Sequence, residues 1–532
     1  MRRFHSYGPV NVKRHFTVPR KMLIDSCLEN LVGDPDEGGH YFTIWAPRQT
    51  GKTWLMQQVT QEIEARYKDR FTVYNFSLGR LRGMNYKPSE DSEELNLPSG
   101  LTDVLEGELP GSPCIKTWNE FYQLFSIDIG IWERPLILFI DEIDTTPPLL
   151  LDIIVNQFRE MYLKPEKNRI HGLALIGVRA VLGVESDRGS PFNIQRSLHV
   201  PNLTREEVKN LYQQYQEESG QTVEQDVVKN VFKVTRGQPG LVCWFGELMA
   251  EKYNPGAGKP INMTIWKTVY RKACYTEWNN TVLNLVKKAK AEYLPHVLDL
   301  FTRPDRRFSL DADWCSYLYL NGIIDTDTKT DPGGEPAEVC RFSSPFIQER
   351  VYNALTSDLI GDRMPILALE PLDDLADVFE NPELNLPALL ERYKSYLKRL
   401  KARGLNPWKD QPRRTDMHLT EAVGHFHLYA WLLSAVGRQC TVSPEFPTGN
   451  GRVDLHLRCG EKRGLIEVKS FINASEAKEA RGQAAKYAKQ TGLNAVTIAL
   501  FTPVEDESVL EELSVEEEID GVRVLVVAIG WM

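Results

Sequence analysis

Residues 41–67 constrain the fold of this chain more than any other segment. A short apolar strand pattern over residues 41–46 runs into a polar turn, and residues 54–67 then repeat apolar side chains at helical spacing. The same alternation continues in strand patterns at residues 71–78, 136–140 and 173–178 and in helical patterns at residues 118–127 and 149–161. Strands that alternate with helices form a parallel sheet, so we expect a doubly wound α/β domain.

The turn at residues 46–53 reads Ala-Pro-Arg-Gln-Thr-Gly-Lys-Thr and matches the phosphate-binding loop, except that Ala46 replaces the first glycine. Backbone N–H groups of such a loop and the positive end of the helix dipole hold phosphates. In this motif Lys52 reaches the β- and γ-phosphates and Thr53 ligates magnesium. We therefore expect an ATP and Mg²⁺ site, with nucleotide contacts from Pro47, Arg48, Gln49, Thr50, Gly51, Lys52 and Thr53.

A pair of acids at the end of a later strand pattern complements this loop. Residues 136–142 read Leu-Ile-Leu-Phe-Ile-Asp-Glu. Asp141 is suited to hold the magnesium shell, and Glu142 is suited to orient or activate the attacking water. Either motif alone could be a chance helix start or a solvated strand end. Together, in a strand-helix alternation, they predict a nucleotide site.

These motifs resemble the AAA-like ATPases of bacteria and archaea that lie close to the STAND group. The resemblance implies a sensor arginine at the end of the strand pattern at residues 173–178, here Arg179. It also implies a G-x-P motif in a helical lid that contacts the base, here Gly237-Gln238-Pro239. A surface arginine and a helix-breaking turn are the alternative interpretations. No residue identifies itself as an arginine finger supplied by a second copy, so a homo-oligomer stays open.

Two acids and a lysine near the C-terminus form a third pattern. Asp454 lies on one strand pattern, and Glu467 and Lys469 lie on the next, on one face because they are two residues apart. Carboxylates of Asp454 and Glu467 with the carbonyl of Val468 are hard oxygen ligands that suit Mg²⁺ or Mn²⁺. Lys469 can position a water or stabilise developing charge on a phosphate. The competing interpretation is a row of alternating polar residues on the wet face of a hairpin.

This pattern resembles the PD-(D/E)XK nuclease superfamily. Gln483 and Tyr487 match the Q-x-x-x-Y motif of its exonuclease-like branch, and Glu421 matches the acid on the preceding helix. The resemblance implies metal-dependent cleavage of nucleic acid, with DNA favoured, and a role in prokaryotic defence. The alternative is a STAND-like signalling switch whose nuclease-like domain binds but does not cut. DNA versus RNA, endo- versus exonuclease cleavage and the triggering ligand stay open.

The patterns together predict an α/β multidomain protein. We expect a P-loop ATPase parallel sheet at residues 1–200, with an exposed, Gly-, Pro- and Ser-rich insertion at 79–117. A helical lid at 201–275 and a winged-helix-like middle domain at 276–360 follow it. A basic helical linker at 361–414 then leads to a restriction-endonuclease-like α/β domain at 415–532. A capping box at Thr204 and Glu207 opens the lid. The acidic helix pattern at residues 311–318 disfavours a third interpretation, a sequence-specific transcriptional regulator.

Charge and cysteine content limit the nucleic-acid contacts and the cellular compartment that we expect. A formal net charge of −10 over 532 residues argues against a wholesale coat of nucleic acid, so contact with it must be local. The most basic stretch, residues 391–414, is interpreted equally well as a phosphate-contacting surface or as a solvated helix face. Eight cysteines without a C-x-x-C pair suit a reduced cytosol, so we expect a cytoplasmic protein with no structural disulfide and no zinc. No apolar stretch is long enough to span a bilayer, so no membrane partner is expected.

Overall fold

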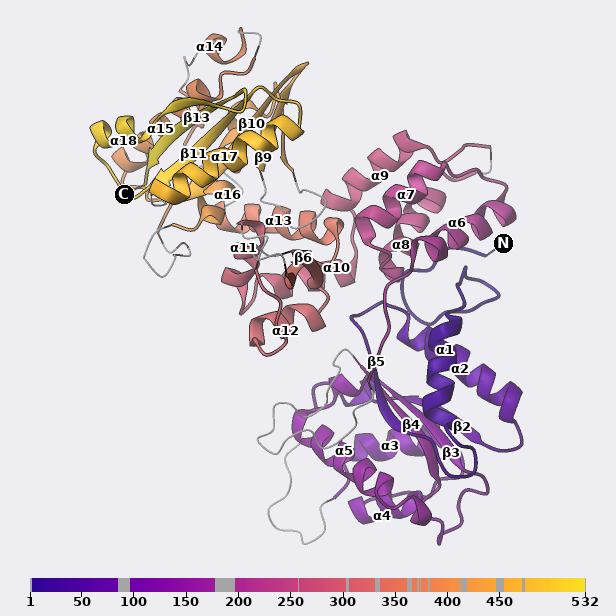
Figure 1. Cartoon of the computed structure of the whole chain (residues 1–532). Helices are drawn as coiled ribbons and strands as arrows, with labels where there is room; N and C mark the ends of the chain where they lie inside the picture. The colour runs from indigo at the N-terminus through magenta and orange to yellow at the C-terminus, as the bar shows by residue number, and fades with distance from the viewer. Residues whose placement is uncertain are drawn as a thin grey trace. The chain divides into compact units, whose positions relative to one another are not determined.

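A computed structural model describes most of the chain (Figure 1). The described residues are 2–84, 96–177, 197–256, 258–302, 306–330, 335–360, 366–370, 373, 375–380, 383–409, 411, 413, 419–445, 454–470 and 474–531. They form two compact units. The first comprises Met1–Thr281 with Leu320–Gly322, and the second comprises Val282–Tyr319 with Ile323–Met532.

The first unit contains a five-stranded parallel sheet in the order β2-β3-β4-β1-β5. Its strands are β1 (Tyr41–Trp45), β2 (Thr72–Ser77), β3 (Leu136–Asp141), β4 (Ile170–Gly177) and β5 (Ser197–His199). The five apolar residues of the interior strand β3 are all buried, as expected for a strand that is covered on both faces. The predicted parallel α/β sheet is confirmed, and the short strand β5 was not predicted.

Helices cover both faces of this sheet (Figure 1). On one face lie α1 (Lys21–Val32) and α2 (Lys52–Tyr67); on the other lie α3 (Ser99–Glu108), α4 (Trp118–Leu124) and α5 (Pro148–Tyr162). Because side chains alternate along a strand, Ile137 and Phe139 enter the core under α1 and α2, whereas Leu138 and Ile140 enter the core under α3 to α5.

The predicted exposed insertion at residues 79–117 is only partly correct. Helix α3 lies inside it and buries Leu101, Val104 and Leu105 in the core under α3 to α5. Those three apolar residues have the i, i+3, i+4 spacing of one helix face, a signal that the surrounding Gly, Pro and Ser content concealed. Residues 85–95 of the insertion lie outside the described part of the chain.

A group of helices completes the first unit. It consists of α6 (Arg205–Ser219), α7 (Gln225–Thr235), α8 (Pro239–Glu247), η4 (Leu248–Tyr253) and α9 (Met263–Tyr275). The predicted capping box is confirmed, because Glu207 N donates to Thr204 Oγ1 at 3.2 Å and Thr204 N donates to Glu207 Oε2 at 2.7 Å. The helical pattern that we assigned to a lid is therefore present.

The second unit begins with helices followed by a hairpin. The elements are α10 (Asn280–Ala289), α11 (Leu294–Thr302), α12 (Asp313–Leu320), β6 (Ile324–Thr330), β7 (Pro336–Phe342) and α13 (Pro345–Ile360). Strands β6 and β7 pair antiparallel, and Arg341 on β7 forms ion pairs with Asp325 at 3.1 Å and Asp327 at 3.3 Å on β6. Residues 331–334, between the two strands, lie outside the described residues, and the winged-helix assignment stays a prediction.

A six-stranded mixed sheet dominates the rest of the second unit, in the order β12-β13-β11-β10-β9-β8. Strands β10, β11 and β13 run parallel to one another, and β9 runs antiparallel to both β8 and β10. The strands are β8 (Thr441–Glu445), β9 (Asp454–Cys459), β10 (Lys462–Ser470), β11 (Ala495–Thr502), β12 (Glu516–Ile519) and β13 (Val522–Gly530). The helices are α14 (Ala376–Phe379), α15 (Leu386–Ala402), α16 (Glu421–Val436), α17 (Ala474–Gln490) and α18 (Glu507–Leu513). Strands β9, β10 and β11 and helices α16 and α17 lie where the sequence pattern placed them.

A disulfide joins Cys440 to Cys459, so the expectation of no structural disulfide is wrong. The two cysteines are 19 residues apart, but the register of β8 with β9 pairs Thr441 with Arg458. The next opposed pair in that antiparallel register is Cys440 with Cys459, and their Cα atoms are 4.3 Å apart. The cysteines meet through strand pairing, which their spacing in the sequence does not reveal.

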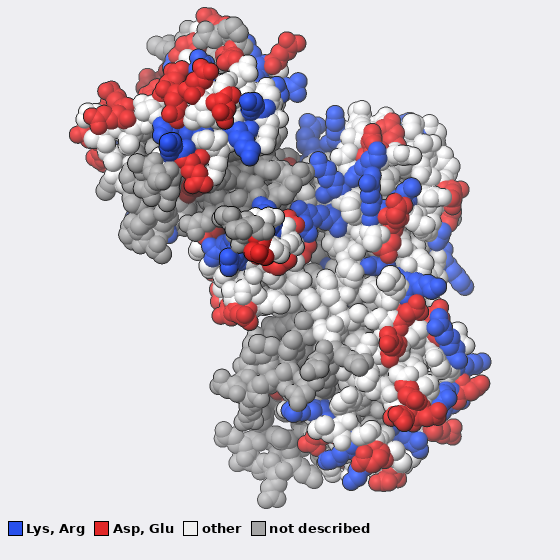
Figure 2. Space-filling model, in the orientation of Figure 1, with Lys and Arg blue, Asp and Glu red and all other residues white. Residues whose placement is uncertain are grey.

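The surface carries charges of both signs. Figure 2 shows Lys and Arg interspersed with Asp and Glu over the described part of the face that it draws. This distribution agrees with the expectation that nucleic acid does not coat the chain. Among the described residues, none of the helices has the length and apolar character needed to cross a bilayer.

Candidate functional site

The loop between β1 and α2 adopts a conformation that depends on its sequence. Gly51 has φ 91° and Gln49 has φ 58°, both in the left-handed region. Glycine enters that region without strain, whereas Gln49 is held there by its surroundings. Thr50 Oγ1 donates to the Pro47 carbonyl at 2.8 Å and closes the turn. Helix α2 then begins at Lys52, so the N–H groups of its first turn are free of helical partners, as the phosphate-binding role requires.

Lys52 is folded against its own loop. Its Nζ donates to the carbonyl oxygens of Ala46 at 2.7 Å and Pro47 at 2.8 Å. Burial lowers the pKa of Lys52 to about 8, because the charged ammonium loses most of its hydration there. Two carbonyl groups thus hold the ammonium in place, and a phosphate at the loop could replace them with a stronger, charge-assisted contact.

Asp141 lies beside Thr53, as the two motifs predict. Thr53 Oγ1 donates to Asp141 Oδ2 at 2.9 Å, and Asp141 Oδ1 accepts from the N–H of Glu142 at 2.7 Å. Burial raises the pKa of Asp141, and these two hydrogen bonds oppose that effect. A hydroxyl and a carboxylate in contact are oxygen ligands that suit magnesium, and the structure brings them together without any metal.

Glu142 is held by residues that the sequence did not identify. Its backbone is left-handed, with φ 56°, and Ser77 Oγ at the end of β2 donates to Glu142 Oε2 at 2.9 Å. Arg82 lies 3.8 Å from the other carboxylate oxygen. Gly79 leaves the carboxylate its space, because a Cβ there would lie 1.9 Å from Glu142 Oε2. The pairing of β2 with β3 was the available signal, since it sets Ser77 opposite Asp141.

The start of α8 contacts the loop directly. Gln238 Nε2 donates to the carbonyl oxygens of Arg48 at 3.2 Å and Gln49 at 3.3 Å, and Gly240 N donates to Gln49 O at 3.1 Å. Pro239 and Gly240 line a cavity of about 140 Å³ together with Gln49, Thr50 and Gly51. The structure therefore brings the G-x-P segment to the phosphate-binding loop. Arg179 lies outside the described residues.

Sequence reasoning missed the N-terminal segment as a wall of this cavity. Its aromatic and polar side chains line the space opposite α8, and Trp54 and Cys243 contribute from α2 and α8. Among the lining residues from this segment are His5, Ser6, Tyr7, Phe16 and Thr17. Aromatic rings beside a phosphate-binding loop suit a flat ligand group such as a nucleobase. The closely spaced aromatic residues of the first 16 positions were the available signal.

Gly237 allows the close approach of this segment to the main chain of Leu203. It has φ 74°, and a Cβ at this position would lie 1.9 Å from the Leu203 carbonyl oxygen. We expect Gly237→Ala to lower the free energy of unfolding by more than about 2 kcal/mol, because left-handed strain adds to a backbone clash. The measurement is the urea unfolding midpoint of the full chain. Gly220→Ala is the matched control, since Gly220 has φ 69° and open space around it. An equal shift for both variants would contradict the clash.

The C-terminal acids and lysine form a second cluster. Glu467 and Lys469 are side by side on β10 and are 5% and 2% exposed. Lys469 Nζ lies 2.6 Å from Glu467 Oε1 and 4.0 Å from Glu421 Oε2 at the start of α16. These contacts are ion pairs rather than well-aligned hydrogen bonds. The wet-hairpin interpretation is wrong for Glu467 and Lys469, because both side chains are buried.

Backbone register places Asp454 beside this cluster. The ladder of β9 with β10 ends at Leu455 paired with Ile466, so the next opposed position in the same register is Asp454 with Glu467. Asp454 is also paired with Glu445 of β8. The side chain of Asp454 lies outside the described part of the structure, so the register locates its backbone only.

Helix α16 is fixed by two buried tyrosine-histidine pairs. Tyr352 of α13 shares a hydrogen bond of 2.5 Å with His425, and Tyr393 of α15 shares one of 2.5 Å with His427. Burial lowers the pKa of each histidine to about 3, so both imidazoles are neutral near pH 7. The pairs set the rotation of α16 and therefore the direction of Glu421 at its first turn.

The Q-x-x-x-Y pair is not gathered into the cluster by the described contacts. Gln483 is exposed on α17 and donates to Glu479 Oε1 at 3.1 Å. Tyr487 is half-buried, and its ring lies edge-on to His456 of β9 with centroids 6.3 Å apart. His456 lies on β9, the strand that begins at Asp454. Tyr487 therefore packs against that strand, whereas Gln483 faces solvent.

The donor chemistry of the cluster suits a hard divalent cation. Glu421 and Glu467 supply carboxylate oxygens, and Val468, which lies between Glu467 and Lys469 on β10, supplies a backbone carbonyl. Carboxylate and carbonyl oxygens are the ligand types that Mg²⁺ and Mn²⁺ take. Among the residues whose side chains are described, no three His, Cys, Asp or Glu gather closely enough to hold a metal ion. The third predicted acid, Asp454, is not among those side chains.

Comparison with known families separates the two halves of the chain. Residues 5–254 match a family model described as AAA-like domain. Residues 416–502 match a second model, described as Domain of unknown function (DUF8371). No curated protein matches the chain. Residues 5–254 are thus similar to an AAA-like domain, and the second match assigns no activity to the C-terminal sheet.

Solved structures that resemble the chain include three P-loop proteins. The Walker-type ATPase PABY2304 of Pyrococcus abyssi is 13% identical with a TM-score of 0.43, covering 65% of this chain and 99% of that one. The Aeropyrum pernix ORC1 protein in complex with DNA is 14% identical with a TM-score of 0.32, covering 64% and 94%. The Thermotoga maritima RuvB Holliday junction branch migration motor is 14% identical with a TM-score of 0.33, covering 64% and 95%.

Proposed function

We propose that the chain is an ATP-regulated, metal-dependent nuclease in which the P-loop unit binds and hydrolyses ATP and the C-terminal sheet cleaves nucleic acid, with DNA favoured. The observation that carries the nuclease proposal is the meeting of buried Glu467 and Lys469 with the partly exposed Glu421. Burying charges is expensive and adds little stability even when they are paired. A buried acid and lysine beside a second acid are therefore better explained by chemistry than by folding.

The residues of the cluster would have different roles in phosphodiester hydrolysis. A bound Mg²⁺ or Mn²⁺ would neutralise phosphate charge and lower the pKa of a water molecule. Glu421, Glu467, the Val468 carbonyl and Asp454 would hold it. Lys469, released from its ion pair with Glu467, would place a positive charge against the phosphate oxygens as negative charge develops there. The low exposure of Lys469 strengthens that interaction, because little water screens it.

The P-loop unit has the parts that ATP hydrolysis requires. Lys52 would leave the carbonyl groups of Ala46 and Pro47 for the γ-phosphate, and Thr53 with Asp141 would hold magnesium. Glu142 would orient the attacking water once it leaves Ser77. Pro239 would contact the base and Arg179 would sense the γ-phosphate, roles that the AAA-like resemblance implies.

ATP affinity should depend on pH through Lys52. Its pKa is about 8 in the free protein, below the ordinary lysine value of 10.5, whereas a bound phosphate favours the charged ammonium. Binding is therefore linked to proton uptake above pH 8, and affinity should fall by up to about tenfold per pH unit as pH rises beyond that value. Calorimetric titration of ATP from pH about 7 to about 9.5 measures this dependence. A constant Kd in the wild type would contradict it, and Lys52→Ala should show no such slope.

The proposal is tested by direct cleavage assays. Purified full-length protein is incubated with single- and double-stranded DNA and RNA, with and without ATP, and with Mg²⁺, Mn²⁺ or Ca²⁺. We expect cutting with Mg²⁺ or Mn²⁺ and poor cutting with Ca²⁺, because Ca²⁺ takes more and longer oxygen ligands and positions a water less firmly. ATP should change the rate. If no nucleic acid is cut under any of these conditions while ATP is hydrolysed, the signalling switch with a non-cutting domain replaces the nuclease.

A further inference from the structure

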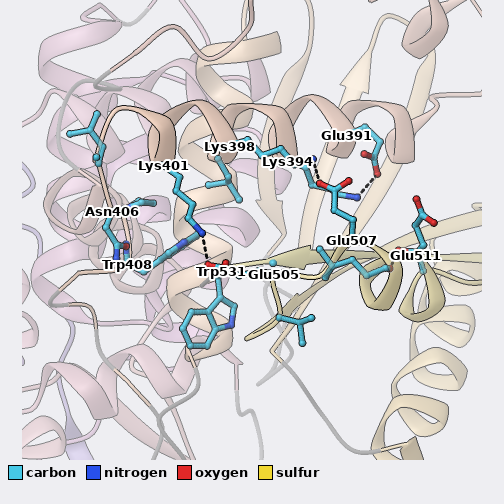
Figure 3. A pocket seen from close by; sticks show the side chains of 18 residues that line it. Glu391, Lys394, Lys398, Lys401, Asn406, Trp408, Glu505, Glu507, Glu511 and Trp531 are labelled. Atoms are coloured by element: carbon cyan, nitrogen blue, oxygen red, sulfur yellow. Dashed lines mark hydrogen bonds and ion pairs between the residues drawn. The ribbon is translucent and has the colours of Figure 1, made fainter.

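A groove lies on the second unit, away from the cluster of Glu421, Glu467 and Lys469. It is bounded by α15 on one side and by residues 504–514 on the other, and its volume is about 630 Å³ (Figure 3). Trp408 and Trp531 line one end. A volume of several hundred Å³ is typical of small-ligand sites. Neither the nucleotide site nor the nuclease cluster uses these residues.

Three lysines of α15 form one wall of the groove. Lys394, Lys398 and Lys401 follow one another at spacings of four and three residues, so they share a helix face (Figure 3). Lys398 forms an ion pair with Glu507, and Lys401 forms one with Glu505, across the groove. The four side chains of these two pairs are 55% to 65% exposed. Exposed ion pairs contribute little, so the lysines can exchange these partners for a better anion.

Two arginines of the basic stretch at residues 391–414 are engaged elsewhere. Arg392 pairs with Asp377 at 2.8 Å, and Arg399 donates to the carbonyl oxygens of Leu367 and Ala368 at 3.0 Å each. These arginines hold neighbouring segments of the chain. The lysine row, by contrast, lines the groove.

Two tryptophans give the groove a flat apolar end. Trp408 and Trp531 both line it. The Arg413 guanidinium lies over the Trp531 ring, 4.6 Å from its centroid, and does not line the groove. Arg413 therefore holds the Trp531 ring in place, and the ring surface suits a flat ligand group.

These features select the chemistry of the ligand. The lining carries three lysines and four glutamates, Glu391, Glu505, Glu507 and Glu511, so a ligand that offers both an anion and hydrogen-bond donors fits it better than a simple anion or cation. The lysine row favours the anionic group, the glutamates accept from hydroxyl or amino groups, and Trp531 offers flat apolar surface. Because Glu505 and Glu507 are more than half exposed, they can turn into solvent when an anion takes the lysines.

We propose that this groove binds a nucleotide, with its phosphate on Lys398 and Lys401 and its base against the ring of Trp531. Aromatic surface combined with cations is the general arrangement that binds single nucleotides and single strands alike. The nucleotide could be a free mononucleotide or one unit of a single strand. The site is separate from the phosphate-binding loop, so it does not depend on ATP binding or on cleavage.

The test measures binding with both other sites silenced. Full-length Lys52→Ala protein in EDTA is titrated calorimetrically with dAMP, with AMP and with a short single-stranded oligonucleotide. In this Lys52→Ala background, a double variant combines Lys398→Ala with Lys401→Ala. The matched control is Arg403→Ala, because Arg403 is a cation at the end of α15 that does not line the groove. Loss of two phosphate contacts should weaken binding by about a hundredfold, and Arg403→Ala should have no effect.

Two further variants separate a binding role from a structural one. Glu505→Gln with Glu507→Gln should tighten binding several-fold, because the lysines then lose their competing partners. Trp531→Ala removes the aromatic surface and should weaken binding by about tenfold. Binding of dAMP or AMP with this variant pattern identifies a free nucleotide as the ligand, and binding of the oligonucleotide alone identifies a strand. If neither binds, or if the lysine and glutamate variants bind like the parent protein, the proposal is wrong whether or not the chain cuts nucleic acid.

Discussion

Lys52→Ala is expected to reduce ATP hydrolysis by at least about a hundredfold while the chain stays folded. The loop has one cation placed for the γ-phosphate, and in the ligand-free structure that cation binds the carbonyl oxygens of Ala46 and Pro47. Removing it takes away both ground-state contact with the phosphate and stabilisation of the charge that develops during transfer. Burial already disfavours the lysine, so its loss should not lower stability greatly.

The measurement is steady-state phosphate release with thermal unfolding as the folding check. Lys68→Ala is the control, since Lys68 lies at the other end of α2 and is exposed. A second variant, Glu142→Gln, should keep ATP affinity and stall hydrolysis, because the amide is nearly isosteric but cannot accept a proton. Unchanged turnover in Lys52→Ala would remove the loop from the active site, and loss of ATP binding in Glu142→Gln would show that its assigned role is wrong.

Loss of an acid from the C-terminal cluster should abolish nucleic-acid cleavage. Asp454→Ala and Glu467→Gln each remove a metal ligand, whereas Lys469→Ala should retain the metal and slow cleavage by about a hundredfold or more. Glu467→Gln is preferred to Glu467→Ala, because an alanine would leave Lys469 buried without its partner and destabilise the sheet by about 3–5 kcal/mol.

Cleavage is measured with Mn²⁺ on whichever nucleic acid the wild type cuts best. Glu461→Ala is the matched control, an exposed acid in the turn of the same hairpin. All of these variants should hydrolyse ATP at wild-type rates, because the phosphate-binding loop belongs to the other unit. Full cleavage by the Asp454, Glu467 and Lys469 variants would show that the cluster is not the active site.

Sequence patterns predicted those parts of the fold whose structure depends on residues close together in the sequence. The phosphate-binding loop, the capping box at Thr204 and the paired positions of Glu467 and Lys469 all depend on spacings of a few residues. Strand alternation sufficed to place Glu467 and Lys469 on one face of β10. The superfamily resemblance gave Glu421 only as the acid on the preceding helix, and its Oε2 lies 4.0 Å from Lys469 Nζ.

The parts that sequence reasoning missed depend on contacts between distant segments. Ser77 meets Glu142 only because β2 pairs with β3, and Cys440 meets Cys459 only because β8 pairs with β9. The N-terminal segment reaches the cavity beside Gln49 after about 40 intervening residues, a distance over which no periodicity operates. The pairing of Lys398 and Lys401 with Glu507 and Glu505 likewise spans about 100 residues, and the charge pattern of the basic stretch does not reveal it.

The two tyrosine-histidine pairs hold α16 against both α13 and α15. His425 and His427 lie two residues apart, so their side chains leave the helix in different directions, one toward α13 and the other toward α15. A helix held from two sides can neither roll nor slide unless both neighbours move with it. Displacement of α13, which follows the hairpin of β6 and β7, would therefore also move Glu421, one helical turn before His425, and alter the distance of 4.0 Å to Lys469. The geometry of the acid cluster is in this way set partly by a helix that contributes no residue to it.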